Sequence, residues 1–297
     1  MMTNLMTDFD AILITGPTAS GKSAKALTLA REYDGVVINA DSMQVYDTLR
    51  VITARPSEKE MQGVQHALYG HVPASLHYST GDWLREVRDV LAGLSQQGRL
   101  PIIIGGTGLY FKALTGGLSD MPAIPAELRE NLRQRAQQEG AASLHAELVR
   151  RDPQLAARLS PTDAQRIIRA LEVLEVTGQS ISVLQEKPGP TIVDPARARK
   201  MIVLPERALL HQRINRRFET MMEEGAVEEV EALLALNLPP DLPAMKAIGV
   251  SQIAAMLRGE ISRAEAIEQA SAATRQYAKR QMTWFRNQMD ESWQRLA

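Results

Sequence analysis

Cysteine is absent from this chain of 297 residues, and aromatic residues make up only 4% of it. The lack of thiols excludes disulfide bonds, a cysteine nucleophile and a zinc site with cysteine ligands. With so few aromatic rings, the hydrophobic core must rest mainly on Leu, Ile, Val, Ala and Met. An apolar content of 44% is enough for a sizeable core.

Long apolar runs are also missing, and no stretch approaches the roughly 18 residues of a membrane span. Residues 1–10 have neither a basic start nor an apolar run, so we expect no secretory leader. A net charge of −1 argues against a protein that coats nucleic acid nonspecifically, but it is compatible with a local basic surface for a structured RNA. We therefore expect a cytoplasmic enzyme without membrane attachment.

A phosphate-binding motif stands near the start of the chain, directly after the apolar segment Ala11–Thr15. Its eight residues are Gly16, Pro17, Thr18, Ala19, Ser20, Gly21, Lys22 and Ser23. They match the pattern G-x-x-x-x-G-K-[ST], in which backbone N–H groups and the start of the next helix hold an anion. Lys22 adds positive charge and the Ser23 hydroxyl suits Mg²⁺, so the motif predicts a site for a di- or triphosphate.

Four short apolar runs predict a parallel sheet: residues 11–15, 36–40, 100–104 and 201–204. Helical periodicity occupies residues 24–31 and 81–97 between them. Helices placed between near-continuous apolar strands require a parallel sheet with both faces covered. The predicted fold class is therefore α/β, with a P-loop-type parallel sheet as the core.

The middle of the chain has a different pattern. Between residues 120 and 199 the strand-like runs stop, helical periodicity takes over, and prolines punctuate the segment. We interpret residues 120–199 as a helical insertion domain. The core then consists of residues 1–119 and 200–297, and it ends in a helical C-terminal region that a loop at 238–243 interrupts.

Polar residues follow two of the predicted strands, at the edge of the sheet where ligands bind in open α/β folds. Asp41 comes after residues 36–40, and Thr107 lies in the glycine-rich turn 105–108. Asp41 either takes part in chemistry, by accepting a proton or holding Mg²⁺ through water, or only caps the following segment. Thr107 either donates to a ligand or belongs to a simple tight turn.

Arginines follow the last predicted strand. Arg213, Arg216 and Arg217 lie on a predicted helix, and Arg213 and Arg217 share one face of it. One interpretation is that an arginine neutralises charge on a leaving group. The other is a solvated face paired with nearby glutamates.

Basic residues also occur in two further tracts. Residues 165–169 place two arginines three positions apart, and residues 275–286 interleave basic and aromatic side chains. Such mixtures suit contacts with RNA. For Trp284 and Phe285, burial in the core is the favoured interpretation.

Five segments together resemble the tRNA dimethylallyltransferases, also called tRNA isopentenyltransferases. The family pattern runs GPTASGKS, DSMQVY, GGTGLY, QR-x-x-RALEV and RQ-x-x-KRQ-x-TWFR. The corresponding segments are Gly16–Ser23, Asp41–Tyr46, Gly105–Tyr110, Gln165–Val173 and Arg275–Arg286. The resemblance implies transfer of a dimethylallyl group from dimethylallyl diphosphate to N6 of adenosine 37 in tRNA, with release of diphosphate.

The resemblance also implies catalytic roles. The phosphate loop would hold the prenyl diphosphate rather than ATP, with Mg²⁺ bound at Ser23. Lys22 and Arg217 would stabilise the departing diphosphate, Asp41 would accept the proton of the adenine amine, and Thr107 would donate toward the bridging oxygen.

The tRNA would be held by the insertion at 120–199, because a stacked adenine must be flipped out to react. Gln44 would read the adenine edge. The residues expected to contact tRNA are Asp41, Ser42, Met43, Gln44, Thr107, Arg129, Gln165, Arg166, Ile167, Ile168, Arg169, Lys246 and Gly249. We expect the enzyme to be a monomer.

Two segments depart from the family pattern. Where the family has D-I-G-T-A-K-P, this chain has Ile52 in place of Gly and Arg55 in place of Lys. The family's R-x-x-G-Y-[KR] stands here as Lys246–Ser251, without the arginine, the aromatic residue and the final basic residue.

Three other functions stay open at this stage. They are an adenylate isopentenyltransferase, a nucleotide or metabolite kinase, and a noncatalytic nucleotide-binding module. The long helical insertion argues against the first, because a free nucleotide needs no clamp.

Overall fold

The computed structural model describes residues 8–119, 121–187 and 189–297. The first seven residues, which entered the expectation of no leader, and the predicted boundary at residue 120 lie outside this description. The chain divides into two compact units, of which the first is Met1–Thr115 with Ile192–Ala297 and the second is Gly116–Thr191. The insertion is therefore shorter than the predicted 120–199. Residues 192–199 belong to the first unit, because Ile192 and Val193 donate to the carbonyl oxygen of Leu114 and the strand predicted at 201–204 already begins at Ala198.

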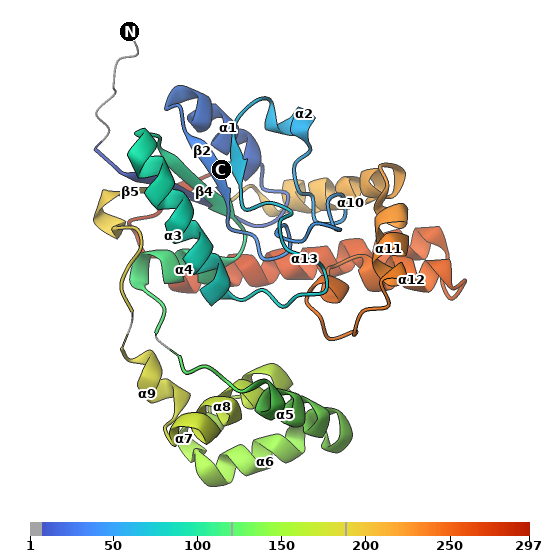
Figure 1. Cartoon of the computed structure of the whole chain (residues 1–297). Coiled ribbons are helices and arrows are strands. Elements are labelled where there is room, and N and C mark those ends of the chain that lie inside the picture. Colours follow the sequence, from blue (N-terminus) through green and yellow to red (C-terminus); the bar gives the residue numbers. More distant parts are fainter. Residues whose placement is uncertain (1–7, 120, 188) are drawn as a thin grey trace. The chain divides into compact units, whose positions relative to one another are not determined.

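The first unit is built on one parallel sheet of six strands (Figure 1). Across the sheet, the strands are β3 (His66–Ala67), β2 (Val36–Asn39), β4 (Pro101–Gly105), β1 (Ala11–Thr15), β5 (Ala198–Val203) and β6 (Gln294–Leu296). In the register, Ile12 of β1 lies between Ile102 and Arg199. The four predicted strands are confirmed. The short edge strands β3 and β6 were not predicted.

Alternate side chains of β1 point to opposite faces of the sheet, as the pleat requires. Ile12 and Ile14 pack with Leu29 of α1 (Lys22–Glu32) on one face. Leu13 belongs to the core on the other face, which is covered by α3 (Thr80–Gln97), α4 (Gly108–Gly116) and α13 (Arg263–Gln288). Both faces of the sheet are therefore covered, as the apolar strands predicted.

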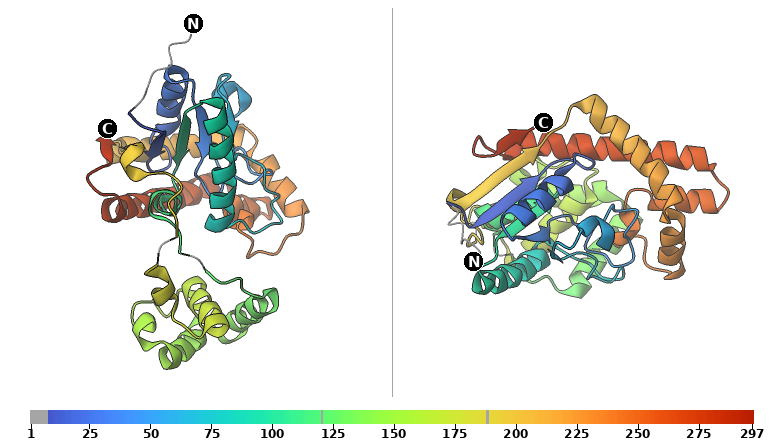
Figure 2. Two further views of the ribbon diagram at one scale, coloured as in Figure 1. Left: turned by 60° about the vertical axis from the view of Figure 1, so that its left-hand side comes forward. Right: turned by 90° about the horizontal axis from the view of Figure 1, so that it is seen from above.

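The remaining helices of the first unit extend this core. They are α2 (Glu58–Met61), α10 (Arg207–Glu223), α11 (Ala226–Ala235) and α12 (Val250–Leu257), with single turns at Pro195–Arg197 and Ala244–Lys246. The long helix α13 packs along α10 and α12 (Figure 2). Within residues 8–119, 121–187 and 189–297, no helix has the length and apolarity needed to cross a membrane.

The regular elements of the second unit, as far as its residues are described, are helices. Its helices are α5 (Ala126–Glu139), α6 (Ala141–Arg151), α7 (Pro153–Ala156), α8 (Ala164–Thr177) and α9 (Ile181–Gln185). Leu144, Leu148, Ile167 and Leu171 are fully buried in its hydrophobic core. This unit has a core of its own, as expected for an inserted domain.

Candidate active site

The phosphate loop joins the end of β1 to the start of α1, where helical N–H groups point outward. Gly21 has φ 90° and caps α1, a left-handed conformation that glycine adopts readily. A Cβ on Gly16 would lie 2.5 Å from the Val203 carbonyl oxygen of β5, so a larger residue cannot fit there. Gly21 is thus required by its backbone conformation, and Gly16 by the close approach of β5. The loop that they form presents the helix N-terminus to an anion.

The Lys22 side chain lies in this loop under the influence of nearby charges. Loss of hydration lowers the pKa of Lys22 from its ordinary 10.5 to about 8; the Asp41 carboxylate raises it and the Arg217 guanidinium lowers it. Lys22 lies at a helix N-terminus, and a bound polyanion there favours its charged form. Lys22, Asp41 and Arg217 therefore lie close enough to influence one another electrostatically.

Arg213 and Arg217 both face this site from α10. The Arg213 guanidinium donates to the Ser20 carbonyl oxygen at 3.3 Å, which ties α10 to the phosphate loop. Displacement of water by protein atoms lowers the pKa of Arg217, and the Glu60 carboxylate of α2 opposes the shift. Two of the three candidate arginines therefore reach the loop region, four residues apart on one helix face.

Asp41 follows β2 and is held by a buried neighbour. The backbone N–H of Asp41 donates to Oδ1 of Asn39 at 2.9 Å, and Nδ2 of Asn39 donates to the Asp41 carbonyl oxygen at 3.0 Å. Oδ1 of Asp41 accepts the Met43 N–H at 2.9 Å. A Cβ on Gly106 would lie 3.6 Å from Oδ2 of Asp41. One carboxylate oxygen thus fixes a local turn, as the capping interpretation holds, while the other lies beside the glycine-rich turn.

Thr107 closes that glycine-rich turn next to Asp41. Its Oγ1 accepts the Ser42 N–H at 3.0 Å and contacts the Ser42 hydroxyl at 3.3 Å. A Cβ on Gly105 would lie 2.0 Å from the Ala40 carbonyl oxygen, and one on Gly108 would lie 2.2 Å from the Trp284 ring. The glycines therefore permit close approach of β2 and α13. This packing brings Thr107 to the strand ends that also carry Asp41 and Lys22.

Three tyrosines lie near the Asp41 carboxylate. Burial raises the pKa of Tyr69, Tyr110 and Tyr277, and the negative charge of Asp41 raises each further. All three phenols therefore stay neutral at physiological pH. They come from the β3–α3 connection, α4 and α13, and the sequence offers no periodic signal that would have grouped them.

The side-chain amide of Gln44 is engaged by the protein itself. Its Nε2 donates to the carbonyl oxygens of Thr53 and Ala54, both at 2.9 Å. Because both amide hydrogens are engaged, only the amide oxygen can serve a ligand. The predicted reading of an adenine edge is therefore restricted to acceptance of a hydrogen bond.

The two segments that depart from the family pattern meet in the structure. Ile52 is buried, and its Cδ1 would lie 2.6 Å from a Cβ on Gly249. The Arg55 guanidinium passes Gly70, where a Cβ would lie 1.4 Å from Nη1. Each substituted side chain thus occupies space beside a glycine, while Lys246 is exposed. The Glu229 carboxylate, missed from sequence, accepts the N–H groups of residues 50–52 and anchors this loop.

In the second unit the predicted tRNA-binding residues divide into two groups. The side chains of Arg129 and Arg169 form ion pairs with Glu172, at 3.2 and 3.0 Å, and the Glu172 side chain is only 6% exposed. Arg166 is 74% exposed and lies 3.4 Å from Asp163. Gln165 is exposed and Ile168 is half-buried.

Ile167 corrects the prediction from the motif. Its side chain is fully buried in the core of the second unit, so it stabilises the helices and presents no surface to RNA. The 3.6-residue periodicity of the segment contained this signal, because Ile167, Ala170 and Leu171 fall on the buried face of α8.

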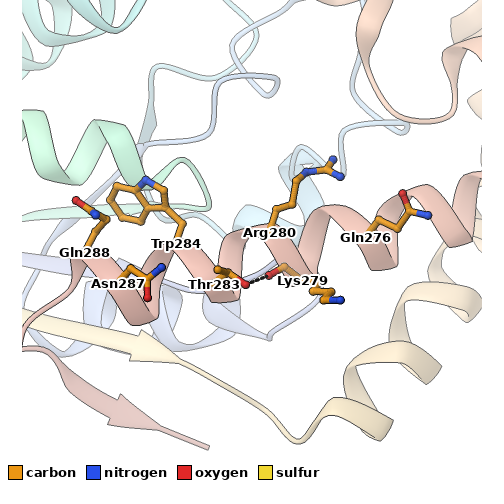
Figure 3. A pocket seen from close by; sticks show the side chains of 7 residues that line it. All are labelled: Gln276, Lys279, Arg280, Thr283, Trp284, Asn287 and Gln288. Carbon is orange, nitrogen blue, oxygen red and sulfur yellow. Dashed lines mark hydrogen bonds between the residues drawn. The ribbon is translucent and has the colours of Figure 1, made fainter. Parts of the chain in front are cut away.

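A basic surface lies along helix α13. One groove, of about 530 Å³, is lined by Gln276, Lys279, Arg280, Thr283, Trp284, Asn287 and Gln288 (Figure 3). A second, of about 420 Å³, lies between α10 and α13 and is lined by Arg207, Leu210, His211, Ala272, Arg275, Gln276, Ala278, Lys279, Met282, Thr283 and Arg286. In the part of the chain that the structure describes, neither lining contains an acidic residue.

The aromatic residues of α13 have the role that was favoured from sequence. Phe285 is buried in the main core, and Trp284 packs against that core over Gly108. Figure 3 shows the Trp284 ring beside the α13 ribbon, with Arg280 one turn away along the helix.

A metal site of protein ligands alone is not found among the described residues, where no group of three His, Asp or Glu side chains converges. Ser23 is exposed at the first turn of α1, directly after Lys22. Mg²⁺ usually keeps several waters and binds phosphate oxygens together with one or two protein oxygens. The residues present therefore fit Mg²⁺ bound together with a diphosphate.

A phosphate loop, a carboxylate and a hydroxyl gathered at the carboxyl ends of parallel strands define an α/β phosphate-loop protein. The IPP transferase family model matches residues 44–288, and the isopentenyl transferase model matches residues 9–69. The chain belongs to the IPP transferase family.

Curated relatives and solved structures agree with this membership. The chain is 74% identical over 296 residues to the tRNA dimethylallyltransferase of Allorhizobium ampelinum, covering 100% of this chain and 97% of the relative. It is 71% identical to that of Agrobacterium fabrum, covering 100% and 99%. The crystal structure of the Bacillus halodurans tRNA isopentenylpyrophosphate transferase matches with 33% identity and a TM-score of 0.68, covering 97% of this chain and 89% of the other. A eukaryotic dimethylallyltransferase acting on tRNA matches with 28% identity and a TM-score of 0.78, covering 93% and 69%.

Proposed function

We propose that this protein is a tRNA dimethylallyltransferase, which moves a dimethylallyl group from dimethylallyl diphosphate to N6 of adenosine 37 and releases diphosphate. The observation that carries the proposal is the electrostatic coupling of Lys22, in the phosphate loop after β1, with Asp41, which follows β2 on the other side of β4. A prenyl diphosphate held over Lys22 would have its diphosphate leaving group near a carboxylate that can accept a proton.

The reaction forms a bond between the adenine N6 and C1 of the prenyl group while the C1–O bond breaks. The electron pair of that bond leaves with the diphosphate, where the Lys22 ammonium and the Arg217 guanidinium stabilise the charge. The proton of N6 passes to Asp41, whose Oδ2 is not the oxygen that accepts the Met43 N–H. The Thr107 hydroxyl, which lies beside Ser42, can turn to donate to the bridging oxygen.

Mg²⁺, when bound, would be held by the Ser23 hydroxyl and by diphosphate oxygens, and it would supply further positive charge against the leaving group. The phosphate loop itself contributes the helix N-terminus and the Lys22 charge.

The basic surface on α13 supports tRNA as the substrate. Arg207, Arg275, Lys279, Arg280 and Arg286 line its two grooves. The whole chain has a net charge of only −1, so this surface concentrates positive charge where an RNA backbone can bind. In the second unit, considered by itself, Arg166 is 74% exposed and offers a further cation to an RNA backbone.

The test is incubation of the protein with Mg²⁺, dimethylallyl diphosphate and an unmodified tRNA that carries A36-A37-A38. We expect a dimethylallyl mass gain on adenosine 37 and release of diphosphate. A tRNA with G37 is the control and should stay unmodified. Comparable transfer to free AMP, or phosphoryl transfer from ATP without any response to the prenyl diphosphate, would contradict the proposal.

A further inference from the structure

The amide of Gln281 joins two turns of the active site that are far apart in sequence. Gln281 lies on α13 and is only 6% exposed. Its Oε1 accepts the backbone N–H of Thr18 at 3.0 Å, and its Nε2 donates to the carbonyl oxygen of Gly106 at 2.9 Å. One side chain thereby satisfies a donor of the phosphate loop and an acceptor of the turn that carries Thr107.

The amide also lies next to the reacting groups. A Cβ on Gly106 would lie 2.3 Å from Nε2 of Gln281 and 3.6 Å from Oδ2 of Asp41. Glycine at position 106 is therefore required for the amide to fit, and the bridge passes beside the carboxylate. The arrangement needs one donor and one acceptor in a fixed order, which a glutamine supplies and a carboxylate does not.

The bridge is not needed to attach α13 to the fold. Phe285 and Trp284 pack the helix on the main core, and Ala278 packs with Ala19 and Leu210. Apolar contacts thus hold the helix on either side of Gln281. The buried amide acts more locally, on the spacing between two turns.

We propose that Gln281 is a positioning residue that fixes the diphosphate loop relative to the turn that carries Thr107 and borders Asp41. This inference rests on the proposed prenyl transfer. In this role, Gln281 keeps a fixed distance between the leaving group over Lys22 and the proton acceptor at Asp41. A displacement of about 1 Å at such a site can lower a rate about 100-fold.

The sharpest test uses Gln281→Glu, which keeps the shape of the side chain. An ionised carboxylate still accepts from Thr18 but repels the Gly106 carbonyl oxygen, whereas the protonated carboxyl donates to it again. Burial and the negative charge of Asp41 raise the pKa of the introduced carboxyl, and Lys22 acts in the opposite direction. We therefore expect the kcat/KM of the variant, relative to wild type, to increase as the pH is lowered from 8.5 to 6. A ratio that does not change with pH would overturn the proposal.

Gln281→Met removes both hydrogen bonds at similar volume, and Gln269→Glu, exposed on the same helix, is the matched control. For Gln281→Met we expect a fall in kcat of about 100-fold. We also expect faster hydrogen exchange in peptides that cover residues 16–23 and 105–110, while the rest of the sheet keeps its protection. Gln269→Glu should match wild type at every pH. Wild-type kcat and exchange in Gln281→Met would overturn the proposal.

Binding of inorganic pyrophosphate with Mg²⁺ separates this inference from the proposed function. If the wild-type protein binds pyrophosphate but modifies no tRNA, the proposed function fails. Gln281 is then judged by binding and exchange alone: weaker binding and faster exchange of residues 16–23 in Gln281→Met support the bridge. Unchanged binding and exchange overturn it.

Discussion

The Lys22 side chain bends back onto its own loop, where Nζ donates to the carbonyl oxygen of Pro17 at 3.1 Å. The ammonium is therefore held within the phosphate loop by a backbone acceptor. Its pKa of about 8 places it where small changes in charge alter its protonation. A bound polyanion is such a change, because it favours the charged form.

Pyrophosphate binding should take up protons near pH 8. About half of Lys22 is neutral at that pH, and the bound anion restores the ammonium. Calorimetry in two buffers of different ionisation enthalpy measures this uptake. Lys22→Arg is the control, because its guanidinium stays charged, and the Lys22 contribution should disappear in that variant. Equal proton uptake by the two proteins would contradict the assignment.

The free energy of unfolding should depend on pH through the same group, Lys22. The folded pKa of Lys22 is lowered to about 8, while the unfolded chain keeps its proton up to about 10.5. Between these values the unfolded state binds more protons, so the free energy of unfolding gains a term that rises with pH. Comparison of urea unfolding at pH 7.5 and 9.5 for wild type and Lys22→Arg isolates this term. No difference between the two proteins in their pH dependence would be the contrary result.

Asp41→Asn should abolish most turnover while it preserves the fold. The amide oxygen can still accept the Met43 N–H, but an amide cannot accept the proton of the adenine amine. We expect kcat to fall by about 10² to 10⁴. Single-turnover assays and filter binding should show slow chemistry and tRNA affinity close to that of wild type. Asp89→Asn on the exposed face of α3 is the control, and full activity of Asp41→Asn would exclude Asp41 from the mechanism.

Two glycine substitutions should change stability in opposite directions. A Cβ on Gly108 would lie 2.2 Å from the Trp284 ring, so Gly108→Ala should destabilise the protein by about 1–3 kcal/mol. Gly93 lies inside α3 with nothing within 4 Å, and Gly93→Ala should stabilise the protein by about 0.5–1 kcal/mol. Chemical denaturation measures both. An equal effect of the two substitutions would show that helix propensity, not close packing, decides at position 108.

Arg166 and Arg169 should behave differently although they lie one turn apart. Arg166 is mostly exposed, so Arg166→Ala should weaken tRNA binding and lower the salt slope of log K by about 1, with little loss of stability. Arg169→Ala should also destabilise the protein, because it removes an ion pair from the buried Glu172 carboxylate. Salt titrations of tRNA affinity and thermal melting distinguish the two effects. An unchanged salt slope in Arg166→Ala would place the RNA elsewhere.

Local patterns were sufficient to predict most of the fold. The central strands are apolar runs, the helix boundaries carry caps such as Ser79 and Gly98, and the phosphate loop has a fixed spacing. The edge strands β3 and β6 escaped prediction, because segments of two and three residues have no period to detect. The insertion was placed too far along the chain, since Ile192 and Val193 return to the first unit before any strand begins.

Site residues could be predicted from the sequence only where they belong to a local motif. Asp41, Thr107 and Lys22 follow strands and lie together. Gln281 and Glu229 act through contacts with backbone groups far away in sequence, and no spacing rule connects them to those partners. Asn39 could have been noticed, because it is a polar residue within the apolar run that precedes Asp41.

A single carbonyl oxygen connects the segments that precede and follow the helical unit. The carbonyl oxygen of Leu114 receives the N–H groups of Ile192 and Val193, at 3.0 and 3.1 Å. The polypeptide thus departs from the α/β core and rejoins it at a single place, the topology that tolerates gain, loss or exchange of a whole module. A different helical unit can in this way be grafted onto an unchanged α/β core by replacing one continuous stretch of gene.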